Sequence, residues 1–371
     1  MPVPYIPGLE LAGAFFAEAV RPLLAEAFPQ LPYAAALLGP GSEILGYDSA
    51  RSTDHDWGPR LQLFLAASDT DRHAAEITAM LASRLPARFR GYPTAFPSTG
   101  EPDGLARYRV TVTELGAWLT GQLGFDPWEP ITVADWLAAP TQLLAEVTAG
   151  TVFHDGPGGL SQARARLSWY PHDVWLYVLA CQWQRIAQEE AFPGRCAEAG
   201  DELGSAIVTG RLARDLMRLC LLMRHRYPPY SKWLGTAFAQ LPEAPAVTLQ
   251  LTAAVTATSW PARQQHLGRA CETAAAMHNE LGITQPLDTR TRGYFDRPYQ
   301  VLDAGRFTAA LREAITDPLI RQLPAVGAVD QFIDSTDALG NAGFLRAAIA
   351  EAKPAGSSTR DTNTRPVGRQ G

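Results

Sequence analysis

The sequence predicts an α+β protein in which a small N-terminal α/β domain precedes a larger all-helical domain. Three observations lead to this prediction. "YAAALLG" (33–39) and "RLQLFLA" (60–66) read as strands, and "ARYRVTVTEL" alternates with the period of two that is typical of a strand. From Gly116 onward the helical period dominates. The chain ends in a polar stretch without aromatic residues, which is typical of disorder.

The elements follow in order. Residues 8–27 and 71–85 are expected to be helices that flank the strands. After residue 116 helical segments are expected at 133–149, 160–168, 171–191, 197–226, 231–240, 246–257, 261–281, 303–315 and 342–352. Residues 288–300 are expected to be irregular. The predicted domains are therefore 1–115, 116–353 and a disordered tail at 354–371.

Composition narrows the class of protein. The 371 residues carry a formal net charge of −6, whereas a general nucleic-acid binder needs a basic face, so no nucleic-acid partner is expected. No apolar run reaches the roughly 18 residues of a membrane span, and the N-terminus lacks the basic start of a signal peptide. The four cysteines show no CxxC spacing, which predicts free thiols in a reducing cytoplasm.

A glycine-serine pair and two aspartates suggest a phosphate and metal site. Gly41 and Ser42 follow the first predicted strand, where backbone N–H groups near a helix start bind phosphate. Asp54 and Asp56 flank His55; on an extended strand their carboxylates converge, and hard oxygen ligands suit Mg²⁺. A charged surface turn is the alternative interpretation of this stretch.

"GPGS…DHD" resembles the signature of the nucleotidyltransferase superfamily typified by DNA polymerase beta and the aminoglycoside nucleotidyltransferases. The resemblance implies that Gly41 and Ser42 bind the phosphates of a nucleoside triphosphate, with ATP expected by the same analogy, and that Asp54 and Asp56 hold Mg²⁺. "GSEILGYDSARSTDHDWGPRL", "TVFHDGPGGL", "YPHDVWLYVLACQW", "GDELGS" and "YPPYSKWLGTAF" together resemble the bacterial DUF4037-containing proteins over most of residues 30–335.

Two features depart from the superfamily pattern. His55 stands where an apolar residue is usual, and Trp57-Gly58-Pro59 follows the acids directly. Because proline cannot donate a hydrogen bond to a strand ladder, the strand either begins after Pro59 or lies at an edge there. The acids are then expected on the loop that enters the strand.

A third acid is needed for a second metal or as a base that deprotonates the attacking hydroxyl. Glu114 ends the alternating strand, and Asp155 lies in "VFHDGPGG", comparable to a segment of some small-molecule nucleotidyltransferases. A helix cap or a turn is the alternative for each.

Lys232 is the candidate in the helical part. Of the 32 basic residues only Lys232 and Lys353 are lysines, which suggests that arginine is a poor substitute at Lys232. Lys232 follows Ser231, which is expected to cap a helix. A similar Ser-Lys pair in the antibiotic nucleotidyltransferases approaches the triphosphate, which implies that Lys232 offsets charge on the leaving pyrophosphate.

The sequence therefore predicts a Mg²⁺-dependent nucleotidyltransferase that transfers a nucleotidyl group from a nucleoside triphosphate to a hydroxyl of a small molecule or protein. The alternative is a non-catalytic nucleotide-binding or regulatory protein that keeps the fold and lacks the third acid.

Overall fold

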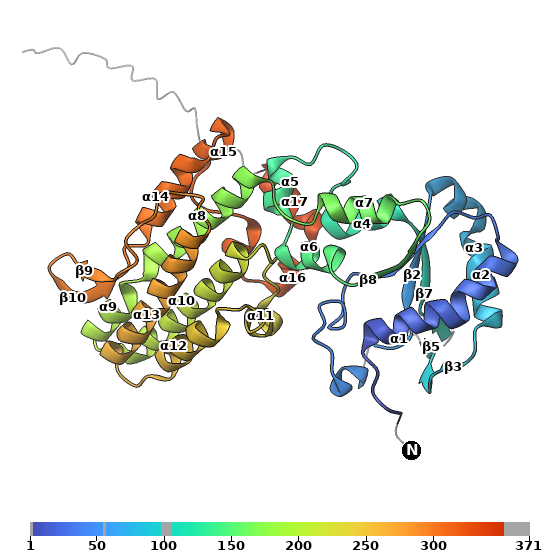
Figure 1. Cartoon of the computed structure of the whole chain (residues 1–371), viewed down its shortest axis with the longest axis horizontal. Helices are drawn as coiled ribbons and strands as arrows, with labels where there is room; N and C mark the ends of the chain where they lie inside the picture. The colour runs from blue at the N-terminus through green and yellow to red at the C-terminus, as the bar shows by residue number, and fades with distance from the viewer. Residues whose placement is uncertain (1–2, 55–56, 98–105, 352–371) are drawn as a thin grey trace, which may run out of the picture.

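The computed structural model describes residues 3–54, 57–97 and 106–351. Asp56 and the predicted tail at 354–371 lie outside the described residues. The sheet with its flanking helices lies at one end of the molecule and the remaining helices at the other (Figure 1).

A four-stranded mixed sheet forms the N-terminal part. Its strands are β1 (Ala34–Leu37), β2 (Leu61–Leu65), β7 (Val110–Glu114) and β8 (Thr151–Asp155), in the order β7-β2-β1-β8. β1 is antiparallel to both of its neighbours, whereas β2 and β7 are parallel. Ala36 pairs with Gln62, so the end of β1 lies beside the start of β2.

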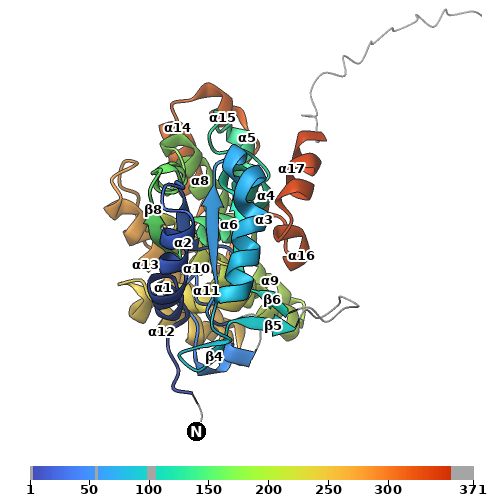
Figure 2. The same ribbon diagram turned by 90° about the vertical axis from the view of Figure 1, so that its right-hand side faces the viewer.

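Alternating side chains of the strands pack on both faces of the sheet. Leu61, Leu63 and Leu65 of β2 belong to one core cluster with Ala35, while Phe64 packs on the opposite face. The first face is covered by α1 (Gly8–Phe15), a π-helical turn (Phe16–Val20), α2 (Arg21–Ala27) and α3 (Ala67–Arg84). These helices lie nearest the viewer in Figure 2.

Helices make up most of the chain after β7. They are α4 (Leu115–Leu123), α5 (Val133–Ala138), α6 (Thr141–Thr148), α7 (Gly159–Arg166), α8 (His172–Glu189), α9 (Phe192–Glu198), α10 (Glu202–Met223), α11 (Ser231–Phe238), α12 (Ala244–Thr256), α13 (Trp260–Glu280), α14 (Gly305–Ala314), α15 (Pro318–Gln322), α16 (Thr336–Leu339) and α17 (Ala342–Glu351). Short 3₁₀ helices occupy Ala50–Asp54 and Val329–Gln331.

Several details differ from the sequence prediction. The helix expected over 133–149 is divided into α5 and α6 at Ala139–Pro140. The helix expected over 197–226 is interrupted by Gly200, whose φ is +76°, and Asp201 then caps α10 by accepting a hydrogen bond from the Gly204 N–H (2.7 Å). The stretch 288–300 contains a hairpin of β9 (Arg292–Tyr294) and β10 (Arg297–Val301). Short strand pairs also form between β3 (Arg88–Phe89) and β4 (Tyr92–Pro93), and between β5 (Ala95–Pro97) and β6 (Ala106–Tyr108).

β8 is the difference that matters for the site. It lies inside the stretch predicted to be all-helical, yet it pairs with β1 as an edge of the sheet. The chain therefore returns to the sheet after α4, α5 and α6, and the Glu146 carbonyl of α6 accepts a hydrogen bond from the Gly39 N–H just after β1.

A large cluster of buried side chains holds the helical part together, with Trp183 and Phe307 stacked at a ring-centroid distance of 4.4 Å. A polar network crosses this core: Arg185 pairs with the buried Asp215 (3.1 Å), and Gln331 donates to Gln182 (3.0 Å). Because buried polar groups require partners, the network fixes the 3₁₀ helix at Val329–Gln331 against α8 and α10. The four cysteines are free. Among the helices described, none has the length and apolar character to cross a membrane.

Candidate phosphate-binding turn and its surroundings

The turn that follows β1 is fixed from three sides. The Gln62 side chain accepts a hydrogen bond from the Leu38 N–H (3.1 Å) and donates one to the Leu38 carbonyl (2.9 Å). The Gly39 N–H donates to the Glu146 backbone carbonyl near the end of α6 (3.0 Å). The Arg60 guanidinium donates to the Pro40 carbonyl (2.6 Å). The backbone that leads into Gly41 is thus held by β2 and α6.

Gly41 and Ser42 present backbone donors at this turn. Gly41 has a φ of +145°, and a Cβ on it would lie 2.3 Å from Arg60 Nη2, so only glycine fits. Among the described residues none accepts a hydrogen bond from the N–H of Gly41 or Ser42. The carbonyls of both residues are used by the next turns, through the N–H groups of Ile44 (3.2 Å) and Tyr47 (2.9 Å). Two N–H groups beside a guanidinium can bind an anion.

A buried ion pair lies directly under the turn. Glu43 is 2% exposed, and its Oε1 accepts hydrogen bonds from Arg60 Nε (2.9 Å) and Nη2 (2.6 Å). Since Arg60 also holds the Pro40 carbonyl, the pair ties the turn to the residue before β2. The sequence analysis missed both residues. Their signal was position alone: a glutamate directly after Gly-Ser and an arginine directly before a strand.

Asp48 and Trp57 anchor the segment that connects the turn to β2. Asp48 Oδ2 accepts hydrogen bonds from the Gly8 N–H (2.7 Å) and from Trp57 Nε1 (3.0 Å). Trp57 is buried and its ring stacks on Tyr5 at 5.9 Å. Burial and the Asp48 carboxylate raise the pKa of the Tyr5 hydroxyl. The start of α1 and both flanks of residues 49–56 are thereby joined.

Asp54 is the last residue of the 3₁₀ helix Ala50–Asp54, and β2 begins at Leu61. The expectation that the strand starts after Pro59 is therefore confirmed, and Asp54 lies before the strand as expected, in a 3₁₀ helix and not in extended backbone. Asp56 lies outside the described residues. Among the described residues there is no group of three or more His, Cys, Asp or Glu side chains that could hold a metal ion. Convergence of the two carboxylates stays a prediction.

Glu114 and Asp155 do not meet the Gly41 turn. Glu114 pairs with Leu65 at the end of β2, and Asp155 pairs with Ala34 at the start of β1. Both acids therefore lie at the opposite end of the strands from the Gly41 turn, which follows the end of β1. Each carboxylate caps a turn of helix. Glu114 accepts hydrogen bonds from the Gly116 N–H (2.7 Å) and the Ala117 N–H, and Asp155 accepts one from the Ser161 N–H (2.8 Å). The sheet register thus favours the capping interpretation for both acids.

Lys232 lies on a helix that the structure brings to the turn. The ring of Tyr47, at the end of the turn, lies 5.4 Å from the ring of Trp233 in the first turn of α11. Lys232 is exposed, and its Nζ lies 4.9 Å from the Trp233 ring centroid. The residue before the helix is Tyr230, and Ser231 is the first helical residue. No side chain caps the start of α11, so the prediction that Ser231 caps it is wrong. In Figure 1 α11 lies on the side of the helical part that faces the sheet.

The first turn of α11 is also linked to α6. The Tyr230 N–H donates to Gln142 Oε1 (3.0 Å), and Gln142 Nε2 donates to Glu146 Oε1 (2.7 Å). Glu146 is 7% exposed, and its burial raises the pKa of the carboxyl while the Gln142 amide opposes that shift. The sequence analysis missed Glu146, because nothing in an amphipathic helix distinguishes one buried glutamate from an exposed one.

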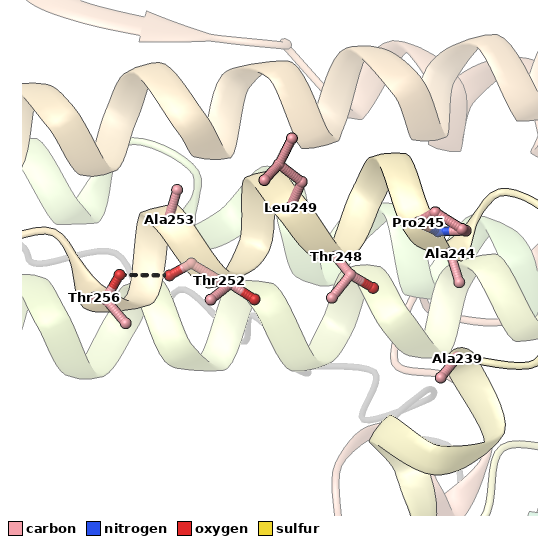
Figure 3. A pocket seen from close by; sticks show the side chains of 8 residues that line it. All are labelled: Ala239, Ala244, Pro245, Thr248, Leu249, Thr252, Ala253 and Thr256. Carbon is pink, nitrogen blue, oxygen red and sulfur yellow. Dashed lines mark hydrogen bonds between the residues drawn. The ribbon is translucent and has the colours of Figure 1, made fainter.

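A shallow depression lies elsewhere, on α12 (Figure 3). It is lined by alanine, threonine, leucine and proline side chains, and Thr256 donates a hydrogen bond to the Thr252 carbonyl there (2.9 Å). The lining contains no ionisable side chain and none of the predicted site residues. The depression therefore has no charged side chain to bind phosphate.

Residues 136–234 match the family described as domain of unknown function (DUF4037). The match spans 99 of the 371 residues of the chain. The match confirms the resemblance over these residues, from α5 into α11, a shorter stretch than residues 30–335. No curated protein matches the chain in sequence. The crystal structure of a nucleotidyltransferase-like protein from Exiguobacterium sibiricum 255-15 is similar at 10% identity with a TM-score of 0.33, over 80% of this chain and 88% of that one.

The DUF4037 match includes two of the predicted site residues, Asp155 and Lys232, and also Glu146. Gly41, Ser42 and the two aspartates precede it. The candidate site therefore combines the N-terminal sheet with α6 and α11, which lie in or at the end of the stretch that matches DUF4037.

Proposed function

We propose that the chain binds a nucleoside triphosphate, with ATP as the first candidate, at the Gly41–Ser42 turn and transfers its nucleotidyl group to a hydroxyl of a small molecule or protein. The observation that carries the proposal is the pair of N–H groups on Gly41 and Ser42, which donate to no described residue and lie beside the Arg60 guanidinium. The surrounding backbone is already held by Gln62, Glu146 and Arg60, so little ordering is needed when an anion binds.

Each residue has a distinct role in the proposal. The N–H groups of Gly41 and Ser42 bind phosphate oxygens. Lys232, whose helix begins beside Tyr47, offsets the negative charge of the leaving pyrophosphate. The Glu43–Arg60 pair keeps the turn in place, because Arg60 holds the Pro40 carbonyl as well as the carboxylate.

Mg²⁺ is part of the proposal, with Asp54 and Asp56 as its ligands. The other acids of the same stretch, Glu43 and Asp48, each use one carboxylate oxygen to hold protein donors. The aspartates have the hard oxygen donors that Mg²⁺ prefers. When bound, the ion would neutralise phosphate charge and polarise the α-phosphoryl group.

One observation favours the non-catalytic alternative. Glu114 and Asp155 were the candidates for the third acid. They lie at the opposite end of the strands from the Gly41 turn. A chain that binds Mg-ATP and transfers nothing would fit that arrangement.

The first experiment measures binding of ATP in the presence of Mg²⁺ by calorimetry. We expect Asp56→Ala and Lys232→Ala each to weaken binding by about tenfold or more, since each removes a charge opposite phosphate or metal. Asp71→Ala, which changes an exposed acid on α3, is the matched control and should bind as the wild type does. No binding to the wild-type chain would contradict both interpretations.

The second experiment follows transfer from α-labelled ATP to kanamycin, glucose, a peptide with serine and tyrosine, and the chain itself. Label on any acceptor that is lost in Asp56→Ala supports transfer. Binding without label on any of them supports the non-catalytic alternative.

A further inference from the structure

We infer that the chain forms a two-fold dimer in which Phe295 of each copy enters the depression on α12 of the other copy. The inference goes beyond the proposed function and does not rest on it. It joins two features at the end of the helical part that lies away from the sheet, namely the tip of the β9–β10 hairpin and the solvent face of α12 (Figure 1).

Phe295 occupies the tip of the hairpin against two costs. It is the first of the two residues between β9 and β10, and its φ of +53° is one that glycine adopts far more readily than a bulky residue. Among the described large apolar residues it is also the most exposed, at 86%. A strained backbone that presents an exposed aromatic ring is more typical of a contact site than of a simple turn.

The hairpin below the tip is firmly anchored. Tyr299 of β10 is buried, and it packs so closely on Gly194 of α9 that a Cβ there would lie 2.5 Å from its ring. The Gln300 N–H donates a hydrogen bond to Gln264 Oε1 of α13 (2.9 Å). Phe295 is therefore presented in a fixed position, which reduces the entropy lost when it binds.

The arginines at the base of the hairpin have acids within ion-pair distance. Arg292 Nη2 lies 3.5 Å from Asp288 Oδ2, and Arg297 Nη1 lies 3.7 Å from Glu198 Oε2. Arginines paired in this way attract phosphate or an acidic surface less than unpaired arginines do. The tip therefore suits an uncharged, apolar partner surface.

The solvent face of α12 is a surface of this kind. Helices at a protein surface usually carry charged side chains towards solvent, yet none of the 13 residues of α12 is ionisable. Leu249, at its centre, is 67% exposed. A depression of about 620 Å³ follows this face, which is room for a phenyl ring. In Figure 3 the side chains of Thr248, Thr252 and Thr256 follow one another along it.

A second copy of the chain supplies the matching occupant. α12 packs on α13, and β10 is hydrogen-bonded to α13 through Gln300, so the tip and the depression belong to elements that share a neighbour. A two-fold axis beside α13 brings each tip to the opposite depression and forms the contact twice. Because each chain has a net charge of −6, two copies repel each other least where their faces carry no charge.

The contact area indicates a weak dimer. A buried aromatic side chain removes about 150–250 Å² from water. One tip and one depression on each copy would therefore bury about 400 Å² per copy, roughly half of a standard interface. Interfaces of this size belong to transient complexes, so we expect monomer and dimer to coexist at micromolar concentrations.

Sedimentation equilibrium between about 1 and 300 µM tests the inference. The mass of the wild-type chain should rise from 40.2 kDa towards twice that value. Phe295→Gly should weaken association by about 100-fold or more, because the dimer contains the contact twice. Its thermal midpoint should stay the same or rise, since glycine tolerates the positive φ. Leu249→Glu, which places a charge in the depression, should weaken association to a similar extent.

The matched control is Leu319→Ser. It changes another exposed apolar residue, 75% exposed and located on α15, and should dimerise as the wild-type chain does.

A mixture of the two impaired variants tests the reciprocal arrangement. In a mixed dimer the Phe295 tip of the Leu249→Glu chain meets the intact depression of the Phe295→Gly chain, so one of the two contacts is restored. Association in the mixture should therefore exceed that of either variant alone by about tenfold.

Three outcomes would overturn the inference. A wild-type mass of 40.2 kDa at every concentration would leave a different protein as the occupant of α12. A dimer that persists in Phe295→Gly or in Leu249→Glu would show that the copies meet elsewhere. A mixture that associates no better than its components would show that the tip does not enter the depression.

Discussion

At Gly41 the backbone conformation and the packing both require a residue without a Cβ. Its φ of +145° is one that L-residues rarely adopt, and a Cβ would meet Arg60 Nη2 at 2.3 Å and Glu43 Oε2 at 2.6 Å. Gly46, in the same turn, also has a positive φ of +72°, but nothing lies within 4 Å of a Cβ there. Alanine at Gly46 would therefore introduce backbone strain alone, whereas alanine at Gly41 would introduce strain and a steric clash.

Gly41→Ala and Gly46→Ala should differ in stability for this reason. We expect Gly46→Ala to lower the free energy of unfolding by about 1 kcal/mol through backbone strain alone. Gly41→Ala should lower it by about 2–4 kcal/mol, because the Glu43–Arg60 pair must also move. Urea denaturation of the two variants measures the difference. Equal losses would mean that Arg60 gives way without cost and does not hold the turn.

The buried Glu43–Arg60 pair affects the geometry of the turn more clearly than it affects net stability. Desolvation of a buried pair offsets much of its attraction, so the pair is weak evidence for net stability. Its clearer effect is geometric: one guanidinium holds the Glu43 carboxylate and the Pro40 carbonyl together. The pair therefore fixes the position of the N–H donors on the next two residues.

At the scale of elements, the sequence predicted helices better than strands. The helices expected at 160–168, 171–191 and 261–281 agree with α7, α8 and α13 to within two residues at each end. The spacing of apolar residues that marks a helix can be read from the residues of that helix alone. β8 and the β9–β10 hairpin were missed. The partner of β8 is β1, more than a hundred residues earlier in the chain, and the five residues of β8 are all half-buried, so they show no alternation of buried and exposed positions. The β9–β10 pairing is interrupted by a register shift between Arg297 and Gln300.

The same distinction applies to the candidate site. Gly41, Ser42 and Lys232 could be singled out because their signals are local: a motif after a strand and a rare residue at a helix start. Glu114 and Asp155 were also chosen from local sequence, but the direction of β7 and β8 places both acids at the opposite end of the strands from the Gly41 turn. Strand direction is a property of the assembled sheet. Glu146 and Arg60 become recognisable only once α6, β1 and β2 lie side by side.

The contact between α8 and α13 yields a prediction about pH. His278 of α13 is fully buried; it accepts a hydrogen bond from Trp183 Nε1 (3.3 Å), and its Nε2 lies 3.0 Å from Thr284 Oγ1. Burial lowers the pKa of His278 from 6.5 to about 4. Below pH 6.5 the unfolded chain therefore binds a proton that the folded chain does not. Stability should fall as pH falls from 6.5 towards 4, by about 1.4 kcal/mol per pH unit from this residue.

Urea denaturation between pH 7.5 and 5 checks this prediction. His278→Gln should be less stable at pH 7.5, because its packing is imperfect, but should show the shallower dependence on pH below 6.5. His172→Gln, which changes an exposed histidine at the start of α8, should keep the wild-type dependence. The same slope in all three chains would show that His278 titrates normally in the fold.

At the scale of the whole molecule, the sheet and the helices meet around the candidate site. The Gly39 N–H donates to the Glu146 carbonyl, the Gly150 N–H donates to the Ile44 carbonyl (3.0 Å), and Tyr47 contacts Trp233. β8 adds a covalent route, since the chain passes from α6 into the sheet and back into α7. The proposed ligand would be held by groups from both sides of this junction, so binding and the cooperativity of unfolding should depend on the same contacts.

Tyr47→Ala should therefore weaken the coupling between the two parts. Tyr47 is half-buried, and loss of its ring should cost about 2 kcal/mol through lost packing. We expect the wild-type chain to unfold in one calorimetric transition and Tyr47→Ala to unfold in two, because the sheet loses its aromatic contact with α11. Mg-ATP should merge the two transitions again, since a ligand that binds only the joined state stabilises it. Tyr294→Ala, which removes a half-buried ring on the β9–β10 hairpin, is the matched control and should keep one transition. One transition in both variants would show that backbone contacts at Gly39 and Gly150 suffice for cooperative unfolding.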